Sequence, residues 1–191
     1  MKTRESGMPP EEIWSGFFDP FMVLKKLGLT ANCRDVLEFE CGYGTFTIPA
    51  AQIIHGSIHA LDIDAQMIEA ANAKVLSSKL PNVNLQLRDF VSDGTGMPDD
   101  SIDYVMLFNI LHAVERDEML DEAWRILALN GTLAVMHWNY DANTPRGPSM
   151  DIRPRPSDCK SWVETSGFQM IGNSSIDLPP FHYGFVFKKS S

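Results

Sequence analysis

The sequence contains few cysteines, and their scarcity bears on redox setting and metal binding. Its 191 residues include only Cys33, Cys41 and Cys159, and no two of them have CxxC spacing. Three scattered cysteines do not form a disulfide framework, and a structural zinc site normally needs paired ligands at short spacing. We therefore expect a reducing, cytoplasmic setting and no metal site.

Long apolar runs and an excess of positive charge are also missing. No run approaches the roughly 20 apolar residues of a membrane-spanning helix, and residues 1–12 are too polar for a secretory signal. Lysine and arginine number 16 against 25 aspartates and glutamates, a net charge of −9. Because binding to phosphate backbones needs a basic face, this balance disfavours nucleic acid as the main partner.

The rest of the composition is that of a globular protein, with 44% hydrophobic and 21% charged residues. The length suits one domain. Within it we expect a helical cover over residues 1–30, a ligand-binding core over 31–138, and a C-terminal region of loop, last helix and β-hairpin over 139–191.

Short apolar runs alternate with amphipathic segments along the chain. Strands are predicted at 36–39, 57–63, 82–88, 102–108, 132–138, 168–175 and 183–188, and helices at 20–27, 45–54, 64–80, 116–127 and 157–165, the last capped by Ser157. This alternation predicts an α/β fold with a largely parallel sheet covered on both faces. Ligands of such sheets bind at the carboxyl ends of the strands, so the residues that follow each strand are the candidates for a site.

A turn with two glycines follows the first predicted strand. Gly42 and Gly44 stand four and six residues after Glu38 and allow the backbone to turn tightly beside a ligand. A dinucleotide-binding fingerprint would require a third glycine where the chain has Thr47. Pyrophosphate binding is therefore disfavoured, while a turn that only joins a strand to a helix remains an alternative.

Asp62 ends the second predicted strand, 24 residues beyond Glu38 (62 − 38 = 24). An acid at this position commonly accepts hydrogen bonds from ribose hydroxyls. Asp64 follows closely and is assigned as the cap of the next helix. The combination of glycine turn and spaced acid predicts a nucleoside-containing ligand.

Two further strand ends carry polar groups. Asp89 and Phe90 can bind an adenine through its amino group and ring, or can be a turn-stabilising acid and a core aromatic residue. Asn109 can offer its side-chain amide to a ligand at the end of the fourth strand. His112 is either a ligand contact or a structural histidine.

Together these residues resemble the class I S-adenosylmethionine-dependent methyltransferases, nearest to the methyltransferase type 11 group related to ubiquinone and menaquinone biosynthesis. The resemblance spans residues 35–136. It implies a Rossmann-like three-layer sandwich with a seven-stranded, mostly parallel sheet whose last strand is antiparallel. It also implies S-adenosyl-L-methionine as cofactor, S-adenosyl-L-homocysteine as product, and these cofactor-binding residues: Glu38, Glu40, Gly42, Tyr43, Gly44, Asp62, Ile63, Met67, Asp89, Phe90 and Asn109.

One residue departs from the family pattern, which has glycine where this chain has Glu40. A glutamate adds bulk and negative charge beside the methionine end of the cofactor. It would strain the loop if the position needs a positive φ, and its carboxylate would otherwise approach the ammonium or sulfonium group of the cofactor. We hypothesise that cofactor binding survives.

The acceptor is expected over the carboxyl ends of the fourth and fifth strands. A long loop at 139–156 follows there, and loops of this length in compact domains are usually functional or disordered. The candidate substrate-binding residues are Trp138, Arg146, Arg153 and His182, and the candidate proton acceptors are His137, His112 and His182. The alternatives are structural histidines and arginines paired with nearby acids.

The N-terminal aromatic residues Trp14, Phe17 and Phe18 are expected either to close over the cofactor as a lid or to cover a sheet edge. The overall expectation is in-line methyl transfer to a small-molecule acceptor. A catalytically weak S-adenosylmethionine-binding module and a nucleotide-dependent oxidoreductase are the alternatives. A monomer and a homodimer are both compatible with the sequence.

Overall fold

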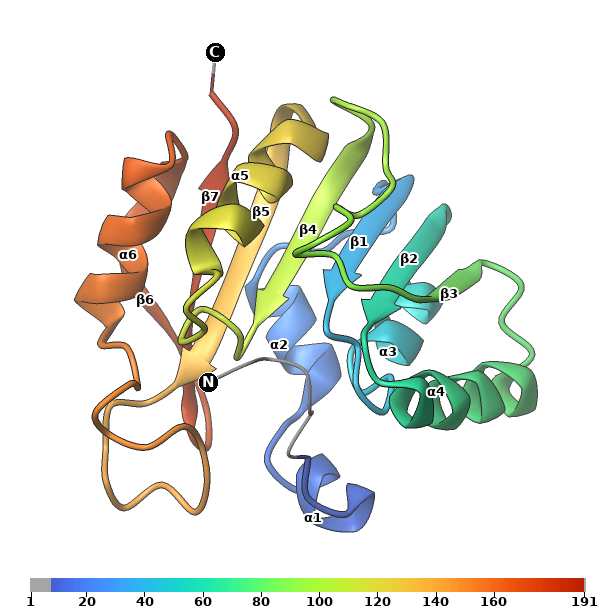
Figure 1. Cartoon of the computed structure of the whole chain (residues 1–191), viewed down its shortest axis with the longest axis horizontal. Coiled ribbons are helices and arrows are strands. Elements are labelled where there is room, and N and C mark those ends of the chain that lie inside the picture. The colour runs from blue at the N-terminus through green and yellow to red at the C-terminus, as the bar shows by residue number, and fades with distance from the viewer. Residues whose placement is uncertain (1–7, 191) are drawn as a thin grey trace.

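The structure, a computed structural model, describes residues 8–190 and contains one seven-stranded sheet with helices on both faces (Figure 1). The strands are β1 (Asp35–Phe39), β2 (Ser57–Asp62), β3 (Val83–Leu87), β4 (Ile102–Phe108), β5 (Leu127–Trp138), β6 (Gln169–Leu178) and β7 (His182–Lys188). The helices are α1 (Glu11–Ser15), α2 (Pro20–Lys26), α3 (Thr47–Ile53), α4 (Ala65–Ser78), α5 (Arg116–Ile126) and α6 (Pro156–Thr165). No helix among residues 8–190 has the length and apolar character needed to cross a membrane.

The sheet order is β3-β2-β1-β4-β5-β7-β6. The first five strands are parallel, and β7 is antiparallel to both of its neighbours, so β6 runs in the same direction as β1 to β5. The expected mostly parallel sheet with an antiparallel last strand is thus confirmed. The chain moves outward from β1 to β3 and then returns to pair β4 with β1, which makes the carboxyl ends of β1 and β4 the topological switch point.

Alternate side chains of β4 belong to two different cores. Val105 and Leu107 pack in a cluster with residues of α5 and α6, whereas Tyr104 and Met106 pack in a cluster with residues of α2 and α3. Side chains alternate between the faces of a strand, so the two helix pairs cover opposite faces of the sheet (Figure 1). A central strand buried on both faces explains why 102–108 is continuously apolar.

The beginnings of two helices follow local capping chemistry. The Asp19 carboxylate accepts a hydrogen bond from the Met22 N–H at 3.0 Å, and Asp64 accepts one from the Gln66 N–H at 2.8 Å. The expected cap at Ser157 is wrong, because α6 already begins at Pro156, a residue that suits the first helical position. Arg155 takes the cap position there.

The fifth strand is longer than predicted. It begins at Leu127, directly after α5, and Asn130 (φ +65°) lies within it rather than in a separate turn. The pairing of β5 with β4 is irregular at this point, because the register shifts between Ile102 and Tyr104. The positive φ of Asn130 agrees with its prediction as a turn residue, but the sequence does not predict that β5 begins before it.

Candidate active site

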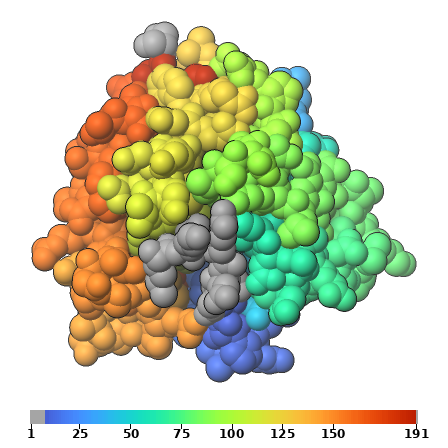
Figure 2. Space-filling model, in the orientation of Figure 1, coloured from blue at the N-terminus to red at the C-terminus, as the bar shows by residue number. Residues whose placement is uncertain are grey.

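The carboxyl ends of the parallel strands meet at one edge of the sheet, the lower edge in Figure 1. The glycine loop leaves β1 at this edge and is tied to the end of β2 by the Cys41 N–H, which donates to the Leu61 carbonyl at 2.9 Å. The residues predicted after the first, second and fourth strands are therefore neighbours in the fold. In the space-filling view, α1 lies at this edge between the loop that follows β5 and α4 (Figure 2).

Asp62 holds the glycine loop in place. Its buried carboxylate accepts hydrogen bonds from the Gly42 N–H at 2.8 Å and the Asp64 N–H at 2.9 Å. Burial raises its pKa, and these backbone donors oppose the rise. A carboxylate has about four lone-pair sites, so Asp62 retains acceptor capacity for a ligand hydroxyl.

Glu38 is buried behind the loop and is held by Thr47. The Thr47 hydroxyl donates to the Glu38 Oε2 at 2.5 Å. Burial raises the pKa of Glu38 to about 8, with the Thr47 hydrogen bond opposing and the Asp62 charge adding to the rise. Thr47, which the sequence shows only as the missing third glycine, is thus a supporting residue of the site. In the sequence, only the position of its hydroxyl, about one helical turn after the glycine loop, indicates this supporting role.

Glu40 adopts a left-handed backbone conformation with φ +52°. A non-glycine residue rarely takes this conformation, so the strain that the sequence predicts for a positive φ is present. Burial raises the pKa of Glu40 to about 8, and the Asp62 charge adds to the rise. Within residues 8–190 its carboxyl group has no hydrogen-bond partner.

The two glycines have the conformations that a close ligand approach requires. Gly42 and Gly44 have φ values of +52° and +74°. A Cβ atom at Gly44 would lie 3.4 Å from the Ala71 Cβ, so α4 packs tightly against the loop. Between the glycines, the Tyr43 carbonyl accepts a hydrogen bond from the Lys74 Nζ at 2.6 Å.

The predicted adenine-binding residues are only partly free to contact a ligand. Met67 is buried and Ile63 half-buried at the start of α4. The Asp89 carboxylate accepts hydrogen bonds from the Ser92 N–H at 3.1 Å and the Ser92 hydroxyl at 3.0 Å. Phe90 packs edge to face against Phe39 with ring centroids 5.0 Å apart. The pair therefore performs the structural roles that the sequence left open, and an adenine contact remains a prediction.

Asn109 presents an unsatisfied acceptor at the end of β4. Its backbone has φ +59°, and its N–H donates to the Met136 carbonyl at 2.7 Å. Its buried Oδ1 atom has no hydrogen-bond partner within residues 8–190. A buried acceptor without a partner costs free energy unless a ligand or water satisfies it. Asn109 therefore fits a residue that binds a ligand at this edge.

His112 and His137 form a close pair between the ends of β4 and β5. The His137 Nε2 and the His112 Nδ1 are 3.4 Å apart. Burial lowers the pKa of His137 well below its usual value, and the neighbouring His112 and His182 lower it further. Burial also lowers the pKa of the half-buried His112, opposed by a hydrogen bond with the Asn109 backbone. Both imidazoles are thus neutral near pH 7, and the strongly lowered pKa of His137 makes it the weaker proton acceptor of the two.

His182 does not join this pair. In the antiparallel register, His137 lies opposite Tyr183 and Trp138 lies opposite His182. Alternation therefore places His182 on the other face of the sheet, against Trp138 at a ring-centroid distance of 4.2 Å and Phe18 at 4.6 Å. Of the three candidate proton acceptors, the structure brings His112 and His137 together and places His182 apart from them. In the part of the chain that the structure describes, no group of three or more potential metal ligands exists.

Arg153 is engaged by its own loop, and its predicted contact with substrate stays a prediction. The loop itself uses its buried guanidinium, which donates to the Pro148 carbonyl at 2.7 Å, the Asp141 carbonyl at 2.9 Å and the Thr144 hydroxyl at 2.6 Å. Further bonds reach the Asn139 and Arg146 carbonyls. This guanidinium organises the loop that follows β5 and has few donors left for an anionic substrate, whereas Arg146 is exposed on that loop.

An aromatic cluster joins the N-terminal segment to the predicted acceptor region. Phe17 packs edge to face on the buried Trp138 with centroids 5.3 Å apart, and Trp14 packs on Phe18 at 4.8 Å. The Trp14 Nε1 donates to the Thr45 hydroxyl at 3.1 Å, which links this cluster to the glycine loop. The segment from residue 8 to residue 18 thus spans both halves of the edge, and residues 1–7 lie outside the described part.

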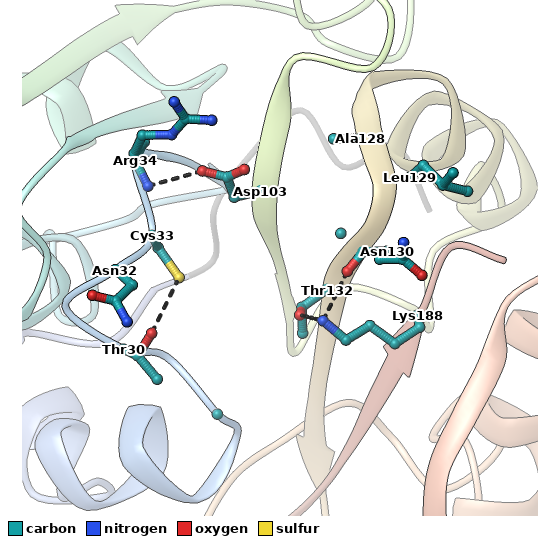
Figure 3. A pocket seen from close by; sticks show the side chains of 12 residues that line it. Thr30, Asn32, Cys33, Arg34, Asp103, Ala128, Leu129, Asn130, Thr132 and Lys188 are labelled. Carbon is teal, nitrogen blue, oxygen red and sulfur yellow. Dashed lines mark hydrogen bonds between the residues drawn. The ribbon is translucent and has the colours of Figure 1, made fainter.

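A hollow of about 460 Å³ lies at the opposite edge of the sheet (Figure 3). Several of its polar groups are used by the fold: Asp103 accepts the Arg34 backbone N–H at 2.8 Å, and the Lys188 Nζ donates to the Thr132 hydroxyl at 2.7 Å. It lies at the amino ends of β1 and β4, whereas ligands of parallel sheets bind at the carboxyl ends. The carboxyl edge therefore remains the candidate site.

Comparison with known proteins agrees with this geometry. The family model described as "Methyltransferase domain" matches residues 36–131. Two curated proteins of Schizosaccharomyces pombe are each 29% identical. The uncharacterized methyltransferase-like C25B8.10 aligns over 76% of this chain and 48% of its own length, and the uncharacterized methyltransferase C25B8.09 over 57% and 40%. The chain thus spans about half the length of the curated relatives it matches or less.

Solved structures share the fold at low sequence identity. A SAM-dependent methyltransferase from Aquifex aeolicus superposes with a TM-score of 0.81 at 21% identity, covering 97% of this chain and 96% of that one. The [4+2]-cyclase SpnF gives 0.75 at 14%, covering 97% and 84%. The Haemonchus contortus phosphoethanolamine N-methyltransferase 2, in complex with S-adenosyl-L-methionine, gives 0.72 at 14%, covering 90% and 52%. These likenesses confirm the fold, and together with the family match they support S-adenosylmethionine as the cofactor.

Proposed function

Because the chain belongs to the methyltransferase domain family, we propose that it transfers a methyl group in line from S-adenosylmethionine to a small-molecule acceptor. One observation carries the proposal. The glycine loop with its buried acids lies at the same sheet edge as the unsatisfied Asn109 and the half-buried His112. This shared edge supports a cofactor site with a proton-accepting group beside it.

The residues present fit the cofactor. Gly42 and Gly44 leave room for close backbone approach, and Asp62 retains acceptor capacity for ribose hydroxyls. Glu38 and Asn109 provide further acceptors, of which the Asn109 Oδ1 is buried without a partner in residues 8–190. When bound, the cofactor supplies an electrophilic methyl group on a sulfonium centre.

The chain's own contribution is alignment and proton transfer. The carboxyl ends of β4 and β5 would hold the acceptor, so that its nucleophile faces the methyl group, a proximity effect. We assign His112 as the group that accepts a proton from an oxygen, nitrogen or carbon acid, because it is the more exposed of the close pair. His137 lies behind it and positions its ring.

A small molecule suits the charge and surroundings of this edge better than a nucleic acid does. The net charge of −9 opposes a phosphate backbone, while the half-buried Phe181, which stacks on the buried Trp138, provides apolar surface near His182. Cys33, Cys41 and Cys159 are all unpaired, which suits a reducing compartment such as the cytoplasm.

A second candidate function is a cofactor-binding module with weak or no turnover. The specific observation in its favour is the strained Glu40, at φ +52°, in the loop that binds the cofactor. Such a module would bind S-adenosylmethionine and transfer no methyl group.

One experiment separates the two. The protein is incubated with S-adenosylmethionine carrying a labelled methyl group and a pool of small metabolites, and products are detected by mass spectrometry. We expect a labelled product that disappears in His112→Asn, while His55→Asn, an exposed histidine remote from this edge, retains it. Cofactor binding without any labelled product would favour the module, and absence of cofactor binding would contradict both.

A further inference from the structure

Among residues 8–190, the carboxyl group of Glu40 has no hydrogen-bond or ion-pair partner, whereas the two neighbouring acids of the site, Glu38 and Asp62, do. Glu38 accepts the Thr47 hydroxyl and Asp62 accepts two backbone N–H groups. The Glu40 carboxyl is half-buried and has no hydrogen bond within residues 8–190, although its backbone is held at a strained φ of +52°. A strained residue with unused acceptors at a ligand-binding edge points to a role toward the ligand.

No cation of the described chain neutralises this group of acids. Lys74 is the lysine bound to the glycine loop, and its ammonium group is engaged by the Tyr43 carbonyl at 2.6 Å and by Glu11 in an ion pair. No lysine or arginine between residues 8 and 190 forms an ion pair with Glu38, Glu40 or Asp62. Because the loop is largely removed from water, charge interactions there are stronger than in solution.

The cofactor and its product differ in charge at this site. S-adenosylmethionine carries a positive sulfonium, and the S-adenosylhomocysteine left after transfer carries a neutral sulfide. We propose that Glu40 is a specificity-determining residue that makes the site prefer the charged methyl donor to its neutral product. This inference rests on the proposed function. A glycine at this position could not provide such a preference. With Glu40, binding of the ligand weakens once the methyl group has left the cofactor.

The burial of Glu40 is consistent with this role. Burial raises the pKa of Glu40 to about 8 because it disfavours an isolated carboxylate. A cationic ligand group bound beside this carboxyl compensates for the burial and favours the charged form. S-adenosylhomocysteine keeps the ammonium group of the methionine end but lacks the sulfonium charge, so it offers no such compensation at the sulfur. The preference is therefore expected to depend on the charge of the ligand and not on its methyl group.

The test is calorimetric titration of the full chain with three ligands at one pH: S-adenosylmethionine, S-adenosylhomocysteine, and sinefungin, an analogue in which a carbon replaces the sulfur and carries a cationic amine in place of the methyl group. We expect Glu40→Gln to reduce the preference for the two cationic ligands over S-adenosylhomocysteine by about tenfold. Glu40→Asp, which keeps the charge, should retain most of it. The control Glu118→Gln changes an exposed acid of α5 and should leave the ratio unchanged.

Glu40→Gly separates charge from strain. This substitution removes both the carboxylate and the backbone strain. We therefore expect all three ligands to bind more tightly, with the same low preference for the cationic ligands as in Glu40→Gln. If the Gln variant does not fold, the Gly variant provides the test. An unchanged ratio in the Gln or Gly variants overturns the inference. Binding by Glu40→Gly but not by the wild-type chain also overturns it and leaves the family assignment intact. Failure of the wild-type and Gly variants to bind any ligand overturns the proposed function itself.

Discussion

At the scale of single residues, the site relies on acids whose charge is suppressed by burial. Glu38 and Glu40 both have pKa values raised to about 8, and Asp62 is shifted in the same direction. Each has a different support: a hydroxyl for Glu38, backbone donors for Asp62, and none within residues 8–190 for Glu40. The three acids therefore differ in what a ligand can gain from them.

Asp62→Asn tests the dual role of Asp62 in structure and binding. An amide has one oxygen instead of two, so one of the two N–H donors, from Gly42 or Asp64, loses its acceptor. We expect a loss of about 1–3 kcal/mol in the free energy of unfolding, measured by urea denaturation. We also expect at least about tenfold weaker S-adenosylmethionine binding, measured by calorimetry.

The matched control is Asp19→Asn, because Asp19 also accepts a backbone N–H but does so as the exposed cap of α2. Asparagine caps helices about as well as aspartate, so little change in stability or binding is expected. Equal effects of the two substitutions on cofactor affinity would contradict the assignment of Asp62.

At the scale of elements, two irregular segments shape the edge: the N-terminal segment with α1, and the loop between β5 and α6. Apart from the short helix α1, neither segment has regular secondary structure. Each is held by particular side chains, Trp14 in the first case and Arg153 in the second. Each can therefore be tested by one substitution.

Trp14→Ala tests whether the N-terminal segment acts as a cover for the cofactor. The change removes the hydrogen bond to Thr45 and the ring contact with Phe18. We expect cofactor affinity to fall by about threefold to tenfold, equivalent to one lost hydrogen bond, with thermal stability little changed. Ile13→Ala, at a 55% exposed neighbour on the same helix, should leave affinity unchanged. A fall in thermal stability without a fall in affinity would favour a purely structural cover.

Arg153→Ala tests the organisation of the loop. Removing the guanidinium leaves several loop carbonyls without donors, so amide hydrogen exchange across residues 139–155 should accelerate by about tenfold or more. Arg155→Ala removes an exposed neighbour that stacks on Tyr140 and should have a much smaller effect. Unchanged exchange in the Arg153 variant, with loss of substrate binding, would instead support the role that the sequence predicts.

At the scale of the whole molecule, buried histidines make stability depend on pH. Burial lowers the pKa of His182 to about 3 from an ordinary value of 6.5. The unfolded chain therefore binds a proton below pH 6.5 while the folded chain does not, and stability falls as the pH decreases from about 6.5 toward 3. Glu38 and Glu40 act in the opposite sense, because their pKa values are raised in the folded chain. The stability that this contributes is lost as the pH rises from 4.5 through about 8.

His182→Phe isolates one of these contributions. Phenylalanine suits the contacts with Phe18 and Trp138, and it does not titrate. The difference in unfolding free energy between variant and wild type should grow in favour of the variant between pH 6.5 and 4, by at most about 1.4 kcal/mol per pH unit. Urea denaturation at several pH values measures it, and a difference independent of pH would contradict the buried neutral imidazole.

The sequence by itself determined the approximate positions of the strands and helices and the order of the site residues along the chain. These depend on local physics: the period of apolar residues, caps such as Asp19 and Asp64, and the need for glycine at Gly42 and Gly44. A parallel sheet brings the carboxyl ends of its strands to one edge, so the sequence is enough to predict that Glu38 and Asp62 lie close together.

The tertiary structure alone decided which side chains meet. His137 and His182 lie on opposite faces of the sheet. His182 pairs with Trp138, the residue after His137, and successive residues of a strand point to opposite faces. The donors of Arg153 are used by loop carbonyls that come close only when the loop closes on itself. The unpartnered Glu40 likewise depends on which cations the fold brings near it. Such contacts join residues far apart along the chain, and no local pattern encodes the distance between them.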